Sequence, residues 1–229
     1  MTAVLESVPG DETALTLDMV VPAAATGPAP LVLLLHGSFG MLPQYRGDIL
    51  SFAEALAEKG IAAAIPHYLD STGTAAGVAV FGEIDSKLPK WRAACADALI
   101  ALAADPRFDP TRIGLLGFSL GGFLALSLAM DPPAPAAIRA VADFFGPTDR
   151  LDPHWSHLPP ALIFHGEKDP LVPVSSSDRV AAGLASAGRK LDSDYFYKVY
   201  PGQKHGFVGS ALTDSRDRTV EFFATLLGK

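Results

Sequence analysis

The chain has 229 residues, of which 49% are hydrophobic and 19% are charged. This composition can bury one large core, and we expect a single domain over residues 1–229. The net charge of -7 argues against nucleic acid and anionic membrane surfaces as partners. The single cysteine, Cys95, excludes an internal disulfide and a cysteine-based zinc site.

The start of the chain carries no targeting pattern. Residues 1–10 include the acidic Glu6 and lack the basic-then-apolar order of a signal peptide. No apolar run reaches the length of a membrane span. We therefore expect a cytoplasmic protein.

The first third of the chain predicts alternating strands and helices. Residues 14–21 alternate loosely and predict an antiparallel edge strand that ends at Pro22. The aliphatic runs at 31–35 and 61–65 predict strands buried on both faces. Between them, Gly60 stands where a helix C-cap glycine belongs. The apolar residues at helical spacing before it are Ile49, Phe52, Ala53 and Leu56.

The next segment, 67–89, has no clear period and contains three glycines. We expect an irregular excursion over the sheet edge that helps to wall a site. A helix follows, whose apolar stripe consists of Trp91, Cys95, Ala98, Leu99 and Leu102. Residues 109–112 predict a turn that feeds a buried strand at 113–118.

The second half of the chain continues the alternation. Strands are expected at 141–145, 161–164 and 195–200, and an irregular excursion at 146–160. Helices are expected at 123–130, 175–187 and 214–227, the last with Val220, Phe223 and Leu227 inward. Such an order predicts an α/β fold, with a mostly parallel sheet covered by helices on both faces.

A Gly-x-Ser-x-Gly motif lies between the strand at 113–118 and the following helix. This is the pattern of a nucleophile elbow. Gly117 and Gly121 are needed because the turn is too tight for side chains on either flank. The turn would expose the Ser119 hydroxyl at the carboxyl edge of the sheet and aim the N–H of Leu120 at the reacting carbonyl.

Two further residues would complete a catalytic triad with Ser119. Asp169 and His205 follow later strands, in the chain order nucleophile, acid, histidine. His205 would take the proton of Ser119, and Asp169 would fix the imidazole tautomer. Glu167 is the nearest competitor for the role of the acid. The other histidines, His67, His154 and His157, share no metal-ligand spacing, so no metal site is expected.

With these motifs, the chain resembles the dienelactone hydrolase family of the α/β-hydrolase superfamily. The resemblance rests on the compact length, the lack of a large cap and three segments, 117–122, 165–173 and 202–207. It implies that Asp169 is the acid rather than Glu167. It also implies that Ser38, in the loop after residues 31–35, supplies the second backbone donor of the oxyanion hole.

The chain is similar to the serine branch of that family. The founding members have cysteine in place of Ser119 and glutamate in place of Gly37. They also have an arginine shortly after the catalytic histidine, whereas residues 206–210 contain no cation. These absences favour a neutral ester or lactone with a small acyl group over an anionic dienelactone, with Lys87 and Arg150 as the cations that could restore anion binding.

The resemblance therefore implies a serine carboxylesterase that cleaves small esters or lactones through an acyl-enzyme, without a cofactor. The same fold also hosts peptidases, thioesterases and acyltransferases. A non-catalytic ligand-binding protein on a hydrolase scaffold is the alternative from another class.

Overall fold

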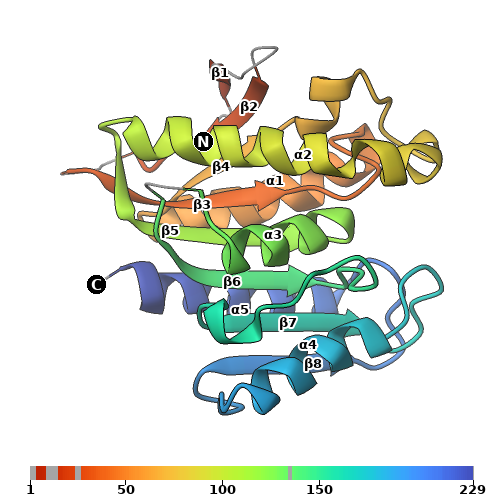
Figure 1. The fold of residues 1–229 in the computed structure, drawn as a ribbon. Coiled ribbons are helices and arrows are strands. Elements are labelled where there is room, and N and C mark those ends of the chain that lie inside the picture. The colour runs from red at the N-terminus through yellow and green to blue at the C-terminus, as the bar shows by residue number, and fades with distance from the viewer. Residues whose placement is uncertain (1–3, 9–14, 24–26, 134–135, 229) are drawn as a thin grey trace.

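The computed structural model describes residues 4–8, 15–23, 27–133 and 136–228. An eight-stranded sheet runs through it in the order β1-β2-β4-β3-β5-β6-β7-β8 (Figure 1). The strands are β1 (Val4–Val8), β2 (Leu15–Val20), β3 (Ala29–Leu35), β4 (Ala62–Pro66), β5 (Phe108–Phe118), β6 (Ile138–Phe144), β7 (Ala161–Gly166) and β8 (Tyr195–Tyr200). All neighbours from β4 to β8 are parallel, whereas β2 pairs antiparallel with both β1 and β4.

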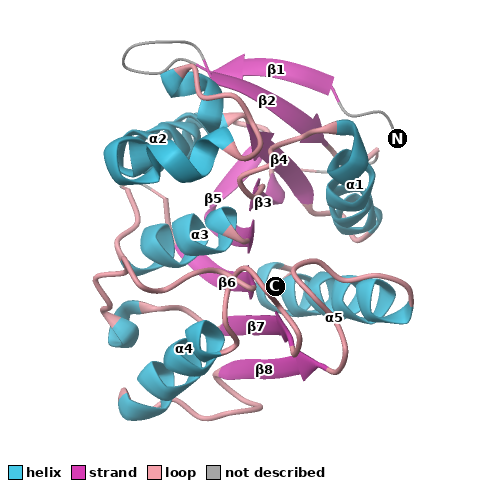
Figure 2. Cartoon of the chain, turned by 90° about the vertical axis from the view of Figure 1, so that its right-hand side faces the viewer, coloured by secondary structure: helices cyan, strands magenta, loops and turns pink. Residues whose placement is uncertain are grey.

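Helices cover both faces of this sheet (Figure 2). One face carries α2 (Ala79–Ala104), α3 (Leu120–Met130) and α4 (Ser175–Ser186), and the other carries α1 (Pro43–Glu58) and α5 (Ser210–Leu227). Two short 3₁₀ helices, η1 (Tyr68–Thr72) and η2 (Trp155–His157), lie in loops. The predicted α/β architecture is confirmed.

Most predicted elements lie where the hydrophobic pattern placed them. The stripe of α1 is buried, and Gly60 ends that helix with a φ of +80°. Val220, Phe223 and Leu227 of α5 are buried as expected. The continuous aliphatic run at 31–35 is fully buried within β3, because helices cover both faces of the strand.

The prediction of an edge strand near the N-terminus is wrong in its position. The strand itself exists as β2, although residue 14 lies outside the described residues. Because β1 pairs along its outer side, from Val4 opposite Met19 to Val8 opposite Leu15, β2 is not at the edge. Loose alternation indicates a strand but does not report whether another strand pairs with it.

The predicted irregular excursion at 67–89 is also partly wrong. Residues 68–72 form η1, and α2 already begins at Ala79. Pro89 lies inside α2, where it removes one backbone hydrogen bond and normally ends or kinks a helix. The helix continues because buried Val80 and Trp91, one before the proline and one after it, both pack into the core.

The predicted turn at 109–112 lies within β5 as an irregularity of the strand. Phe108 pairs with Ala29 and Ile113 with Leu31, so the residues between them bulge out of register. The Asp109 carboxylate accepts hydrogen bonds from the N–H and hydroxyl of Thr111, at 2.9 and 2.7 Å. The predicted turn is therefore present, but it interrupts a strand instead of preceding one.

The excursion at 146–160 forms loops around η2, as predicted. Across the described ranges of the chain, no helix has both the length and the apolar character needed to cross a membrane.

Candidate active site

Ser119 stands at the junction of β5 and α3. Its φ of 54° and ψ of -119° lie in a region that non-glycine residues rarely adopt. The Ser119 N–H donates to the carbonyl of Phe144, 2.9 Å away, and the N–H of Gly122 donates back to the Ser119 carbonyl at 2.8 Å. These bonds hold the strained residue in place.

The glycines on either side of Ser119 lie in very close backbone contacts. A Cβ on Gly117 would collide with the carbonyl of Gly121, and a Cβ on Gly121 would collide with the carbonyl of Leu35. A side chain at either position would push β3, β5 and α3 apart. The turn thus has the tightness that the motif predicted.

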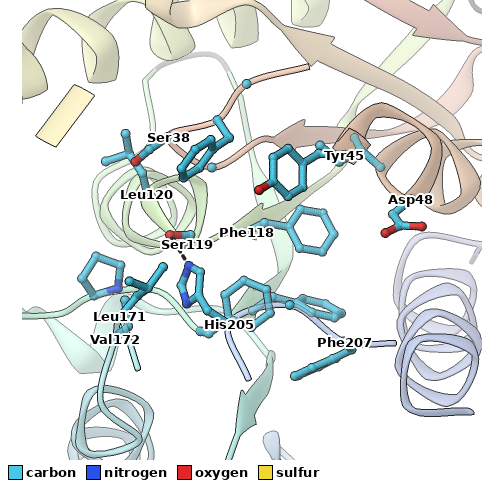
Figure 3. A pocket seen from close by; sticks show the side chains of 18 of the residues that line it. Ser38, Tyr45, Asp48, Phe118, Ser119, Leu120, Leu171, Val172, His205 and Phe207 are labelled. Carbon is cyan, nitrogen blue, oxygen red and sulfur yellow. Dashed lines mark hydrogen bonds between the residues drawn. The ribbon is translucent and has the colours of Figure 1, made fainter. Parts of the chain in front are cut away.

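His205 and Asp169 reach Ser119 from loops that follow β8 and β7. Nε2 of His205 lies 2.8 Å from the Ser119 hydroxyl, as the dashed line in Figure 3 marks. Nδ1 of His205 lies 2.7 Å from Oδ2 of Asp169. With its proton on Nδ1, the imidazole donates to the carboxylate and accepts from the hydroxyl. The structure therefore brings the three predicted side chains into one hydrogen-bonded chain.

The Asp169 carboxylate is completely buried, and both of its oxygens have hydrogen-bond partners in the protein. Its Oδ1 accepts from the N–H groups of Leu171 and Val172, at 2.8 and 3.0 Å. Nε2 of His165 lies 3.4 Å from Oδ2, and Nδ1 of His165 bonds to the Ser177 hydroxyl at 2.7 Å. Burial lowers the pKa of His165, which favours a neutral ring there. These contacts fix the orientation of the acid toward His205.

Glu167, the competing acid, points elsewhere. Its carboxylate accepts a 2.8 Å hydrogen bond from the N–H of Gly202 in the loop that carries His205. It thereby braces that loop. The carboxylate in contact with the imidazole is that of Asp169.

The His205 ring packs against Phe145, a residue that sequence reasoning did not single out. Their ring centroids are 4.7 Å apart, and Phe207 also packs against Phe145, with centroids 5.4 Å apart. Phe145 has a φ of 46°, which turns the chain at the end of β6. Positive φ is rare at phenylalanine, and no sequence motif predicts it at this position.

Ser38 and Leu120 both line the pocket beside Ser119. Neither backbone N–H donates a hydrogen bond to any other residue that the structure describes. The Ser38 loop is held by bonds from Gly40 N–H to the Gly37 carbonyl and from Gly77 N–H to the Ser38 carbonyl, each 2.9 Å. Two fixed N–H groups beside the hydroxyl can stabilise an oxyanion.

The base of the Ser38 loop is anchored by His36. Its ring stacks on Tyr68, with centroids 4.3 Å apart, and the Tyr68 hydroxyl donates to the His36 carbonyl at 2.7 Å. Burial lowers the pKa of His36 to about 4, so this ring is neutral at physiological pH. His36 therefore has a structural role in positioning the loop.

The pocket in front of Ser119 has a volume of about 500 Å³, within the usual range of small-molecule sites. Residues 67–89 contribute Phe81 and Ile84 to its walls, as predicted, and residues 146–160 contribute Pro147 and Arg150. Helix α1 adds Ile49 and Phe52, and α5 adds Leu212. Figure 3 shows Tyr45, Phe118 and Phe207 on the side of the pocket toward Asp48.

The remaining charged and histidine candidates lie apart from Ser119 or are already paired. Arg150 lines the pocket, but its guanidinium bonds to Asp85 at 2.6 Å and to Asp149 at 2.9 Å. His154 stacks on His157, with centroids 5.5 Å apart. Among the described residues, no group of three or more His, Cys, Asp or Glu side chains is arranged to hold a metal ion.

Comparison with known proteins gives a consistent match. The sequence model of the dienelactone hydrolase family matches residues 18–224. A carboxymethylenebutenolidase of Pseudomonas putida is 24% identical over 227 residues, which cover 93% of each chain. A dienelactone hydrolase of Anabaena variabilis superposes with a TM-score of 0.70 at 23% identity, covering 99% of this chain and 98% of that one. A dienelactone hydrolase-like promiscuous phosphotriesterase from metagenomic libraries gives a TM-score of 0.80 at 21% identity, covering 98% of both chains.

Proposed function

The chain belongs to the dienelactone hydrolase family, and within it we propose a serine carboxylesterase that cleaves esters or lactones of small molecules. The observation that carries this proposal is the hydrogen-bonded chain from Ser119 through His205 to Asp169. It opens into a pocket of about 500 Å³ that Ser38 and Leu120 line.

In the proposed reaction, the Ser119 oxygen attacks the ester carbonyl while Nε2 of His205 accepts the hydroxyl proton. The carbonyl oxygen becomes negatively charged and accepts hydrogen bonds from the N–H groups of Ser38 and Leu120. Asp169 stabilises the imidazolium that forms, and remains ionised. His205 then gives its proton to the departing alcohol, which leaves an acyl group on Ser119.

The second half of the reaction repeats these roles with water. His205 takes a proton from the water molecule that attacks the acyl carbonyl. The tetrahedral intermediate again faces the two N–H donors. When it collapses, the Ser119 oxygen leaves and takes the proton back from His205, and the carboxylic acid is released.

Replacement of the three side chains tests the proposal. We expect Ser119→Ala, His205→Ala and Asp169→Asn each to lower kcat for p-nitrophenyl acetate by roughly 10⁴-fold or more, without loss of the fold. The matched control is Glu167→Gln, which removes the competing acid and should retain most of the activity. Circular dichroism recorded beside the turnover separates catalytic loss from unfolding.

Labelling by a fluorophosphonate separates an enzyme from a non-catalytic binder. We expect rapid modification of the wild-type protein at Ser119 and none in Ser119→Ala. Wild-type protein that stays unlabelled and turns over no ester would contradict the proposal. An Asp169→Asn variant with normal kcat would move the role of the acid to another residue.

A further inference from the structure

One end of the pocket is built from aromatic rings. Tyr45 from α1, Phe118 from the end of β5 and Phe207 from the His205 loop line it (Figure 3). Phe118 packs against Phe144 at 4.8 Å between ring centroids, and Phe207 against Tyr200 at 4.7 Å. These contacts fix the Phe118 and Phe207 rings in place. The faces of aromatic rings carry partial negative charge and attract cations.

A carboxylate lies at the same end. Asp48 lines the pocket from α1, one helical turn beyond Tyr45, and Figure 3 shows it on the far side of Phe118 from Ser119. Its backbone carbonyl accepts a bond from the Ser51 hydroxyl at 2.7 Å. Within the described residues, its carboxylate has no hydrogen-bond or ion-pair partner. The negative charge of Asp48 is therefore uncompensated.

The positive charge in the walls does not offset Asp48. Arg150 is the only lysine or arginine among the described residues that line the pocket. Its guanidinium is bound by two carboxylates, those of Asp85 and Asp149. The whole chain adds a net charge of -7. An anionic or aromatic environment with no free cation favours a positively charged ligand.

We propose that this end of the pocket binds a cationic group of the substrate, either a quaternary ammonium or a protonated amine. The residues that form it are Tyr45, Asp48, Phe118 and Phe207. The proposal rests on the proposed function for the reaction, and it names the substrate class as esters that carry such a group. The apolar rings contact its carbon atoms while Asp48 balances its charge. The carbon isostere of the same group keeps only the apolar contacts.

The expected size of the effect follows from the exposure of the site. An ion pair at an exposed carboxylate strengthens binding by up to about fivefold. Ring faces contribute roughly another two- to fivefold for a cation at their centre. A cation should therefore bind about tenfold more tightly than its isostere.

The test compares choline with 3,3-dimethylbutan-1-ol, in which carbon replaces the ammonium nitrogen. Dissociation constants of both are measured by ligand-observed NMR at low ionic strength, with wild-type protein, Asp48→Asn and Glu54→Gln. Glu54 is the matched control, because it is an exposed acid of α1 that does not line the pocket. We expect choline to bind wild type and Glu54→Gln about tenfold more tightly than the alcohol. In Asp48→Asn this preference should fall by about three- to fivefold.

Equal binding of the two probes to the wild-type protein would overturn the proposal. An unchanged preference in Asp48→Asn, or an equal loss in Glu54→Gln, would also overturn it, because the cation would then not be held by this carboxylate. Turnover of p-nitrophenyl acetate by the same preparations tests the proposed function separately. A choline preference without ester turnover would retain the cation site and refute the esterase.

Discussion

At the scale of single residues, Asp143 is a buried acid with a hydrogen bond to only one of its two carboxylate oxygens among the described residues. It lies on β6 against the elbow, where a Cβ on Gly122 would collide with its Oδ1. That oxygen accepts a 3.1 Å bond from the N–H of Gly146, while Oδ2 is buried without a hydrogen-bond partner among the described groups. Burial raises the pKa of Asp143 to about 7. Ionisation of this residue therefore opposes folding.

We predict that Asp143→Asn changes how stability depends on pH. The acid binds its proton more tightly in the folded state, where its pKa is about 7, than in the unfolded chain, where it is about 3.9. The stabilisation from this proton is complete below about pH 4 and is lost as the pH rises toward 7. The loss is about 1.4 kcal/mol per unit by which the two values differ.

Urea unfolding of both proteins from pH 4.5 to 8 measures this effect. As the pH rises over this range, the free energy of unfolding of the wild type should fall by a few kcal/mol relative to that of Asp143→Asn. The size of the fall follows from the difference between the pKa values of Asp143 in the folded and unfolded states. All other titrating groups are shared by the two proteins and cancel in the comparison. Parallel curves across the range would show that Asp143 is not protonated in the folded protein.

The residues of the hydrogen-bonded chain, Ser119, His205 and Asp169, could be predicted from the sequence, because each follows a strand in a recognisable motif. The surrounding residues could not. Phe145 and Asp143 belong to a segment that reads only as a buried strand, and neither their contacts nor the positive φ of Phe145 has a local signature. Tyr45 and Asp48 stand on an ordinary amphipathic helix, and only the fold brings them to the pocket.

At the scale of elements, the elbow depends on the close approach of β3, β5 and α3. We predict that Gly121→Val abolishes activity or soluble expression, because a Cβ at that position collides with the Leu35 carbonyl and lies 2.6 Å from the His36 carbonyl. Leu35 ends β3 and His36 follows it directly, on the segment that leads into the Ser38 loop. Displacement of that segment would move Ser38, the proposed oxyanion donor, as well as Ser119, the proposed nucleophile.

Gly82→Ala is the control for this substitution. Gly82 lies in α2 with open space where its Cβ would be, so alanine should stabilise the helix by about 0.5–1 kcal/mol and leave turnover intact. Thermal melting and p-nitrophenyl acetate turnover are measured for both variants. Normal turnover in Gly121→Val would show that the turn is not a nucleophile elbow.

In two of the elements that sequence reasoning misplaced, a local signal did not mark the boundary of the element. The first turns of α2 were hidden by Pro89, whose local penalty is outweighed by packing of Val80 and Trp91 in the core. The bulge in β5 carries genuine turn chemistry at Asp109. At Pro89 tertiary packing overrides a local preference, whereas at Asp109 the local preference is kept and the strand pairs on either side of it.

At the scale of the whole molecule, the parallel sheet explains why distant loops meet. The carboxyl ends of β3, β5, β7 and β8 lie at one edge, so the loops with Ser38, Ser119, Asp169 and His205 converge there. The order of chemical groups along the chain was sufficient to predict this convergence. The wall formed by α1 and α5 was not predictable, because it depends on which face each helix covers.

The charge of the molecule leads to a final prediction, on anionic substrates. Arg150 is already neutralised by Asp85 and Asp149, and Lys87 is not among the described residues that line the pocket. The chain carries a net charge of -7, which repels anions over the range of a Debye length.

We therefore expect kcat/KM for p-nitrophenyl hemiglutarate, whose acyl chain ends in a carboxylate, to be roughly tenfold below that for p-nitrophenyl pentanoate. Added salt should narrow the gap by screening the repulsion. Lys87→Ala should leave the ratio unchanged. Arg150→Ala should lower the hemiglutarate rate further, because it frees two carboxylates at the rim. A wild-type preference for the hemiglutarate that either substitution abolishes would instead show that one of these cations binds the substrate carboxylate.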